Sequence, residues 1–153
     1  MALLDIPPDR RTEGGDTVAL EFFLAMRPPT STAQERAVRI VGGRAIFYDP
    51  PEVAEARAKL EAHLARHKPP KPYPSAVPIR LITRWCYPYP ESGRHHDGEY
   101  KITRPDTDNS IKLLKDCMTR VGYWHDDAQV ASELTEKFWA DVPGIYIRVE
   151  PLE

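Results

Sequence analysis

The sequence predicts an α+β fold, a mixed β-sheet with two helices on one face. The order of the elements predicts it: strand, hairpin, helix, strand, long loop, helix and two strands. The periods of the apolar residues support this order, because strands alternate every second residue and helices repeat every three or four. The chain has 153 residues, 41% of them hydrophobic and 29% charged, which is typical of one globular domain.

The first half of the chain contains two strand-like regions and one helix. Residues 17–26 alternate as a strand does, and a proline-rich turn follows. Residues 37–41 and 44–48 are strand-like and joined by Gly42-Gly43, which suits a tight hairpin turn. A helix is expected from Asp49, as its cap, to about Lys68.

In the second half of the chain, the sequence predicts a strand at residues 79–87, a long loop at 88–105 and a helix that ends at Gly122. It also predicts strands at residues 130–139 and 145–149. We expect residues 1–16 to be a flexible leader and residues 17–153 to form the domain. The sequence has no apolar run that could span a membrane and no signal-peptide pattern. These absences and the two cysteines, expected to be reduced and buried, fit a cytosolic protein.

Four aspartates flank the second helix in two pairs. Asp106 and Asp108 stand at its start, and Asp126 and Asp127 follow its end. Lys112 lies one turn after Asp108 on the polar face, opposite an apolar face of Ile111, Leu114, Met118 and Val121. Mg²⁺ and Mn²⁺ prefer such carboxylate oxygens, so the pattern indicates a divalent-metal site beside a lysine.

Each of these features has a simpler interpretation. An aspartate at a helix start often only caps the helix through its side-chain oxygen. A pair of adjacent aspartates is often a solvated turn, and Lys112 with Asp108 can be a surface ion pair. A turn after Gly122 would bring one of the later pair back toward the polar face of the helix, and strand alternation predicts that only one of the two is a ligand.

The two ends of this region resemble the RusA family of Holliday-junction resolvases. That family has an Asp-x-Asp-Asn opening, a lysine on the next helix, and a Gly-Phe/Tyr-Trp-x-Asp-Asp-Ala-Gln-Val close. Here the opening is residues 106–109 and the close is residues 122–130, at the family's spacing. One departure is Ser110, where the family commonly has an apolar residue. We expect Ser110 on the flank of the helix, with an effect on packing and none on metal ligation.

The resemblance implies roles for individual residues. Asp106, Asp108 and Asp127 correspond to the catalytic carboxylates that hold Mg²⁺, with Mn²⁺ as a substitute, and Lys112 corresponds to the catalytic lysine. Asn109, Asp126 and Gln129 occupy motif positions with less defined roles. The resemblance also implies a RusA-like fold, a homodimer that makes two symmetric nicks, and a cytoplasmic protein of bacterial or phage origin.

The charge distribution bears on DNA binding. A net charge of −2 does not favour a simple nucleic-acid-binding protein, but residues 1–16 hold four acids and two bases, so the remainder is neutral. Residues 71–104 hold six Lys/Arg against three Asp/Glu. The basic residues that we expect to contact DNA are Arg44, Arg94, Lys101, Arg104 and Lys115.

The function expected is therefore a magnesium-dependent endonuclease that resolves four-way DNA junctions in recombination and repair. A nuclease for other branched or single-stranded DNA would use the same residues. A DNA-junction-binding module without catalysis would keep the basic residues but would not need the three carboxylates. A glycosyltransferase also uses Asp-x-Asp, but no nucleotide-sugar-binding strand–helix repeat is evident.

Overall fold

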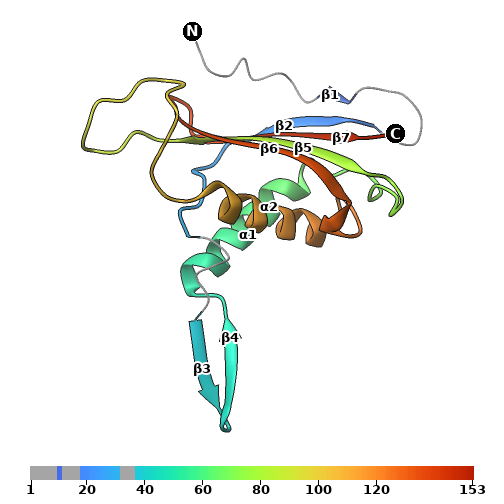
Figure 1. The fold of residues 1–153 in the computed structure, drawn as a ribbon, viewed down its shortest axis with the longest axis horizontal. Helices are drawn as coiled ribbons and strands as arrows, with labels where there is room; N and C mark the ends of the chain where they lie inside the picture. Colours follow the sequence, from blue (N-terminus) through green and yellow to red (C-terminus); the bar gives the residue numbers. More distant parts are fainter. Residues whose placement is uncertain (1–9, 12–17, 32–36) are drawn as a thin grey trace.

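The computed structural model describes residues 10–11, 18–31 and 37–153. Its main sheet has the strand order β1-β2-β7-β5-β6, and both helices lie on the same face of that sheet (Figure 1). All pairs are antiparallel except β5 with β6, so the sheet is mixed. The predicted α+β class with two helices on one face is confirmed.

The strands follow the predicted alternation. Their bounds are β1 Arg10–Arg11, β2 Leu20–Leu24, β5 Ile79–Tyr87, β6 Val130–Trp139 and β7 Gly144–Pro151. Strand β5 lies between β6 and β7, and its side chains at Ile79, Leu81 and Trp85 are fully buried against the helices and neighbouring strands. Period-two burial along an interior strand fixes its register, because a shift by one residue would expose this whole set.

Helix α1 spans Pro51–Ala65 and buries Val53, Ala56, Leu60 and Leu64. It ends before the predicted Lys68, and Asp49 is not its cap. The N-cap is Pro50, without a side-chain hydrogen bond, and the Asp49 carboxylate instead binds Arg57 Nε at 2.8 Å. A proline at the cap already sets the extended backbone that the helix start requires.

Helix α2 spans Thr107–Val121 and ends at Gly122, whose φ of 104° is the left-handed conformation predicted for it. Ile111, Leu114 and Met118 are buried as predicted, while Val121 is only partly buried. The buried face is wider than the sequence indicated, since it also includes Ser110, Leu113 and Cys117.

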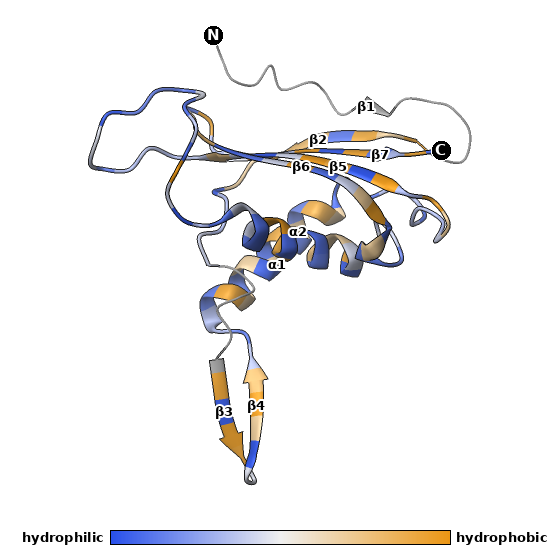
Figure 2. Ribbon diagram, in the orientation of Figure 1, coloured by the Kyte–Doolittle hydropathy of each residue, from blue (hydrophilic) through white to orange (hydrophobic). Residues whose placement is uncertain are grey.

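Strands β3 (Ala37–Val41) and β4 (Arg44–Tyr48) form the predicted hairpin, with Gly42 and Gly43 at positive φ. The hairpin projects away from the sheet and helices as an arm (Figure 1). Every residue of β4 is exposed. The pairing places Val38 beside Phe47 and Ile40 beside Ala45, so one face of the arm carries only apolar side chains (Figure 2).

The predicted leader lies outside the described residues except for Arg10 and Arg11, which pair with Glu21 and Leu20 at the sheet edge. Among the described helices, neither has the length and apolarity needed to cross a membrane.

Gly144 generates a prediction about the fold. A Cβ at this position would lie 2.1 Å from Phe23 Cζ and 2.6 Å from the Leu24 carbonyl oxygen. Gly144→Ala should therefore lower the free energy of unfolding by about 1–3 kcal/mol, the usual cost of overpacking. Urea denaturation measures it. Adding Phe23→Leu should recover only part of the loss, because the carbonyl contact remains, and full stability in the single variant would contradict the prediction.

Candidate metal and DNA site

The end of the long loop is fixed to strand β6. Backbone hydrogen bonds join Gly98 N to Trp139 O at 2.9 Å, Trp139 N to Glu99 O at 2.8 Å, and Lys101 N to Lys137 O at 3.0 Å. These bonds extend the sheet by a short antiparallel segment beside β6. The residues that lead into α2 therefore start from a defined position.

Two lysines then hold the backbone just before α2. Lys137 Nζ donates to the carbonyl oxygens of Thr103 and Pro105, both at 2.7 Å. Lys101 Nζ donates to Thr103 O at 3.1 Å, to Thr103 Oγ1 at 2.5 Å and to Arg104 O. We call Lys101 and Lys137 the lysine clamp. A carbonyl group forms a stronger hydrogen bond with an ammonium group than with a neutral donor. The clamp therefore fixes the backbone that leads to Asp106.

Lys101 is not placed to contact DNA, contrary to the sequence-based prediction. Its side chain is buried, with the residue 6% exposed, and Nζ lies 4.7 Å and 5.0 Å from the ring centroids of Trp139 and Tyr87. Burial, together with the charge of Lys137, lowers the pKa of Lys101. The aromatic rings and three oxygens already satisfy this ammonium, which leaves it unavailable to a phosphate.

Asp106 and Asp108 stand at the start of α2 with free side chains. Asp106 is the N-cap, and its carbonyl accepts the Ser110 N–H at 3.1 Å, but its carboxylate makes no capping hydrogen bond. Both aspartates are exposed, and neither forms an ion pair with any described residue. The interpretation of Asp106 as a side-chain cap is therefore wrong, and both carboxylates remain available to a cation.

Lys112 and Lys115 have different surroundings. Lys112 is exposed on the polar face, and its predicted ion pair with Asp108 is absent from the described part of the chain. Lys115 pairs with Glu133 of β6, with 2.9 Å between Nζ and Oε2. Lys112 is therefore the freer of the two cations. The predicted contact of Lys115 with DNA would require it to give up or share Glu133.

The second aspartate pair divides into a structural and a free residue. Asp126 caps the short helix η1 (Asp127–Gln129) by accepting the Ala128 N–H at 2.9 Å. Gln129 accepts the N–H groups of His125 and Asp126, and donates to the carbonyls of residues 74 and 77. Asp127 is exposed and outside this network. The strand alternation expected for the pair is wrong, because Asp126 and Asp127 form a turn and a helix start. That only one of them is a metal ligand stays a prediction.

The two free carboxylate groups lie at opposite ends of α2. Asp126 and Asp127 do turn back to its polar face, where they line a cavity of about 440 Å³ with Asp116 and Arg120. These residues belong to the C-terminal half of the helix, however. Asp106 and Asp108 stand at the N-terminal end of the helix and are not among the residues that line this cavity. Accordingly, the described residues contain no group of three His, Cys, Asp or Glu that could hold a metal ion.

The other predicted DNA contacts are accessible. Arg94 lies exposed in the long loop, Arg104 lies exposed two residues before Asp106, and Arg44 lies near the tip of the arm. Arg39, on the paired strand, places its guanidinium 5.6 Å from the ring centroid of Tyr48. The exposed arginine side chains therefore lie at three separate places, which are the arm, the long loop and the segment before α2.

Comparison with known proteins agrees with this arrangement. The family model described as Endodeoxyribonuclease RusA matches residues 27–150, most of the chain. This chain belongs to the RusA family. It is also 31% identical over 110 residues to a protein of Lactococcus phage r1t named crossover junction endodeoxyribonuclease rusA, covering 72% of this chain and 81% of that relative.

For this RusA family member, sequence reasoning missed one residue of the site and misjudged another. Lys137 was not singled out, although it carries half of the lysine clamp, because a lysine in an alternating strand has the pattern of an ordinary solvent-facing residue. Ser110 was expected on the flank of α2 but is 2% exposed. Only the fold brings Lys137 to the carbonyls before Asp106.

The clamp generates the second prediction. Lys137→Met should lower the free energy of unfolding by about 1–3 kcal/mol, because two carbonyl groups lose a charged donor. It should also speed hydrogen exchange in residues 101–110, measured by mass spectrometry. Lys115→Met is the matched control, since its partly exposed ion pair with Glu133 is worth at most about 1 kcal/mol. Equal effects of the two variants would contradict the clamp.

Proposed function

We propose that this protein is a divalent-metal-dependent endodeoxyribonuclease that cuts four-way DNA junctions. The observation that carries the proposal is the start of α2, where Asp106 and Asp108 present unpaired, exposed carboxylates on a backbone held by the lysine clamp. Membership of the RusA family and the name of the phage relative support DNA junctions as the substrate.

The donor set fits Mg²⁺, with Mn²⁺ as a substitute. Magnesium is usually held by one or two carboxylates together with water and substrate phosphate, and Asp106 and Asp108 supply two such groups. When bound, the metal supplies an activated water and charge relief on the scissile phosphate. Lys112, one turn further on and without an ion pair among the described residues, stabilises the negative charge that builds up on that phosphate.

A homodimer accounts for the remote position of Asp127. In a two-fold pair, a contact of one residue with a second is repeated with the roles exchanged. A second copy can therefore bring its Asp127 to Asp106 and Asp108 of the first, and the reverse, although the described residues of one chain do not bring these carboxylates into one metal-binding group. Such a pair would hold two equivalent sites, as paired symmetric nicks require. We propose that it acts in the cytoplasm, in recombination and repair.

The arm and the loop supply the DNA contacts. Residues 37–48 contain two arginines and no acidic residue, in a chain whose net charge is −2. One face of the arm carries Arg39 and Arg44, which suits phosphate groups. Arg94 and Arg104 extend the cationic surface toward α2.

A nuclease for other branched or single-stranded DNA remains the second candidate, because it would need the same carboxylates. The test is a comparison of cleavage rates on four-way junctions, flaps and single strands. A non-catalytic DNA-binding module is less well supported. Such a module has no need for two unpaired carboxylates at the start of α2, next to the backbone that the lysine clamp holds.

Asp108→Asn tests the metal site. Asparagine keeps the side-chain size, and the lost charge near the helix N-terminus costs about 0.3–1 kcal/mol of stability. We expect a nearly unchanged melting temperature, retained binding of a four-way junction in a gel-shift titration, and Mg²⁺-dependent cleavage reduced roughly a hundredfold or more. Asp141→Asn is the matched control, because Asp141 is an exposed aspartate between β6 and β7 whose carboxylate accepts the Tyr89 hydroxyl. Normal cleavage by folded Asp108→Asn protein would refute the metal site.

Asp126 and Asp127 should respond in different ways. Asp126→Asn can still accept the Ala128 N–H, so it should affect stability and cleavage only slightly. Asp127→Asn should leave stability unchanged and abolish most cleavage. Mixing Asp127→Asn with Asp108→Asn protein should restore part of the activity, because one intact site would form in the mixed dimer. Urea denaturation and a cleavage time course measure these effects, and an absence of restoration would argue against a site shared between copies.

A further inference from the structure

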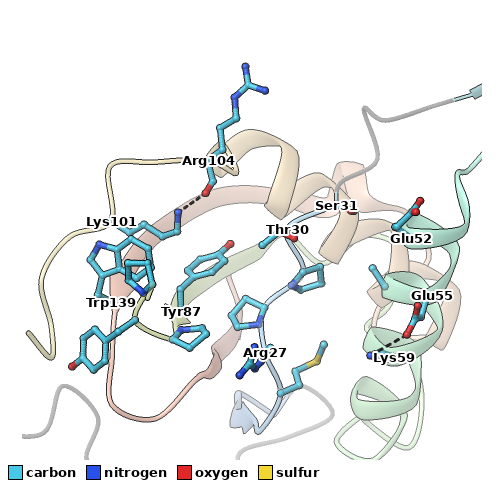
Figure 3. Close-up of a pocket in the computed structure, with 17 residues that line it drawn as sticks. Arg27, Thr30, Ser31, Glu52, Glu55, Lys59, Tyr87, Lys101, Arg104 and Trp139 are labelled. Carbon is cyan, nitrogen blue, oxygen red and sulfur yellow. Dashed lines mark hydrogen bonds and ion pairs between the residues drawn. The ribbon is translucent and has the colours of Figure 1, made fainter. Parts of the chain in front are cut away.

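A second concave site lies beside the start of α2. It is a cavity of about 600 Å³ between the segment at residues 26–31, the first turns of α1 and the end of β5 (Figure 3). Arg104 lines it, and Arg104 is two residues before Asp106 along the chain. The floor includes Lys101 and Trp139, so the cavity shares its wall with the lysine clamp.

The walls combine flat apolar groups with unpaired cations. Pro28, Pro29, Pro88, Pro90 and Tyr89 give rigid rings on two sides. Four cationic residues and two acidic ones line the cavity. Lys59 pairs with Glu55 at 3.2 Å, and Lys101 is satisfied by carbonyl oxygens, which leaves Arg27 and Arg104 exposed and without an ion pair to any described residue.

The cavity wall includes a buried hydroxyl with spare hydrogen-bonding capacity. Tyr87 is 2% exposed, and the neighbouring Ser110 hydroxyl is the one partner within reach of its hydroxyl among the described residues. Figure 3 shows this hydroxyl pointing to the Thr30 side of the cavity. The Ser110 hydroxyl is also buried and has no other partner among the described residues. A hydroxyl donates one hydrogen bond and can accept others, so this pair can still bond to the edge of a ligand in the cavity.

We propose that this cavity binds one unstacked nucleotide of the DNA substrate, with the base in the cavity, its edge at the Tyr87 hydroxyl, its phosphate at Arg27, and the adjoining DNA backbone at Arg104 outside the cavity. The proposal rests on the proposed function and deepens it, because it makes the cavity a determinant of base preference near the cut. A base is flat and apolar on its faces and carries hydrogen-bonding groups on its edge, which matches rings on the walls and a hydroxyl inside. Cavities of this size hold small organic ligands.

The charge and position favour a nucleotide over an apolar ligand. Arg27 and Arg104 lie on opposite sides of the cavity, and the Arg104 side chain extends away from it (Figure 3). An anionic strand can bind a phosphate at each arginine, whereas an apolar ligand would use neither charge. The crossover of a four-way junction also offers bases that unstack at lower cost than those inside a duplex. The short sequence distance from Arg104 to Asp106 places this base near the scissile phosphate.

Insertion of a base into the cavity can be tested without cleavage of the DNA. A four-way junction carries 2-aminopurine at one position at a time around the crossover, and wild-type protein is added in the presence of a chelator. We expect a several-fold change in fluorescence at one position on each of two opposing strands. Thr30→Phe fills the cavity from an exposed position of the 26–31 segment. It should abolish the fluorescence change, while the affinity for the junction in a gel-shift titration should fall by a smaller factor.

Base reading is tested with Tyr87→Phe, which removes only the hydroxyl. Cleavage of junctions that differ in the base at the responsive position should show a preference in wild type that falls by roughly three- to tenfold in this variant. The rate on the least preferred base should be unchanged. Tyr100→Phe is the matched control, because Tyr100 is exposed outside the cavity and its hydroxyl binds Glu136. It should keep the wild-type preference.

The results separate this proposal from the proposed function. Cleavage of the junction without any 2-aminopurine change, or with a change that survives in Thr30→Phe, overturns the nucleotide site and leaves the nuclease intact. An identical base preference in Tyr87→Phe and wild type overturns the role of the hydroxyl, and would show that it bonds only to Ser110. A fluorescence change with no Mg²⁺-dependent cleavage supports the nucleotide site and refutes the nuclease.

Discussion

Much of the site depends on two ammonium groups that bind three consecutive backbone carbonyls. Lys101 and Lys137 hold residues 103–105, and through them the first turn of α2, against the edge of the sheet. Burial first, and then repulsion from the nearby charge of Lys137, lower the pKa of Lys101. The carbonyl oxygens and the rings of Tyr87 and Trp139 offset that cost. The acidic residues after the clamp therefore need no internal partner to stay in place.

The length of α2 is the second constraint. Its apolar face packs into the core, so the helix cannot bend to bring its ends together. Asp106 and Asp108 at one end and Asp127 at the other are consequently separate features of one chain. In the homodimer that we propose, a site that needs both copies would be active only in the assembly that makes two cuts.

The arm and the nucleotide cavity share a chemical character, since each places apolar surface next to arginine. On the arm the two occupy opposite faces, with Arg39 and Arg44 on one and Val38, Ile40 and Phe47 on the other. In the cavity the prolines and tyrosines form the walls, and Arg27 and Arg104 form the rim. DNA offers both phosphate charge and apolar base faces, which explains how a chain with net negative charge can still present suitable surfaces.

The sequence by itself determined the local elements and the identity of the reactive groups. Alternation placed β5 at its observed residues, Gly42-Gly43 placed the hairpin turn, and Gly122 ended α2, because these signals depend on residues adjacent in the chain. Only the tertiary structure decided which groups are free and which are near one another. It buried Lys101, recruited Lys137 from a strand remote in sequence, and left Asp106, Asp108 and Asp127 without a common metal-binding group among the described residues. Distances between residues remote in sequence follow from how elements pack, and no local pattern encodes them.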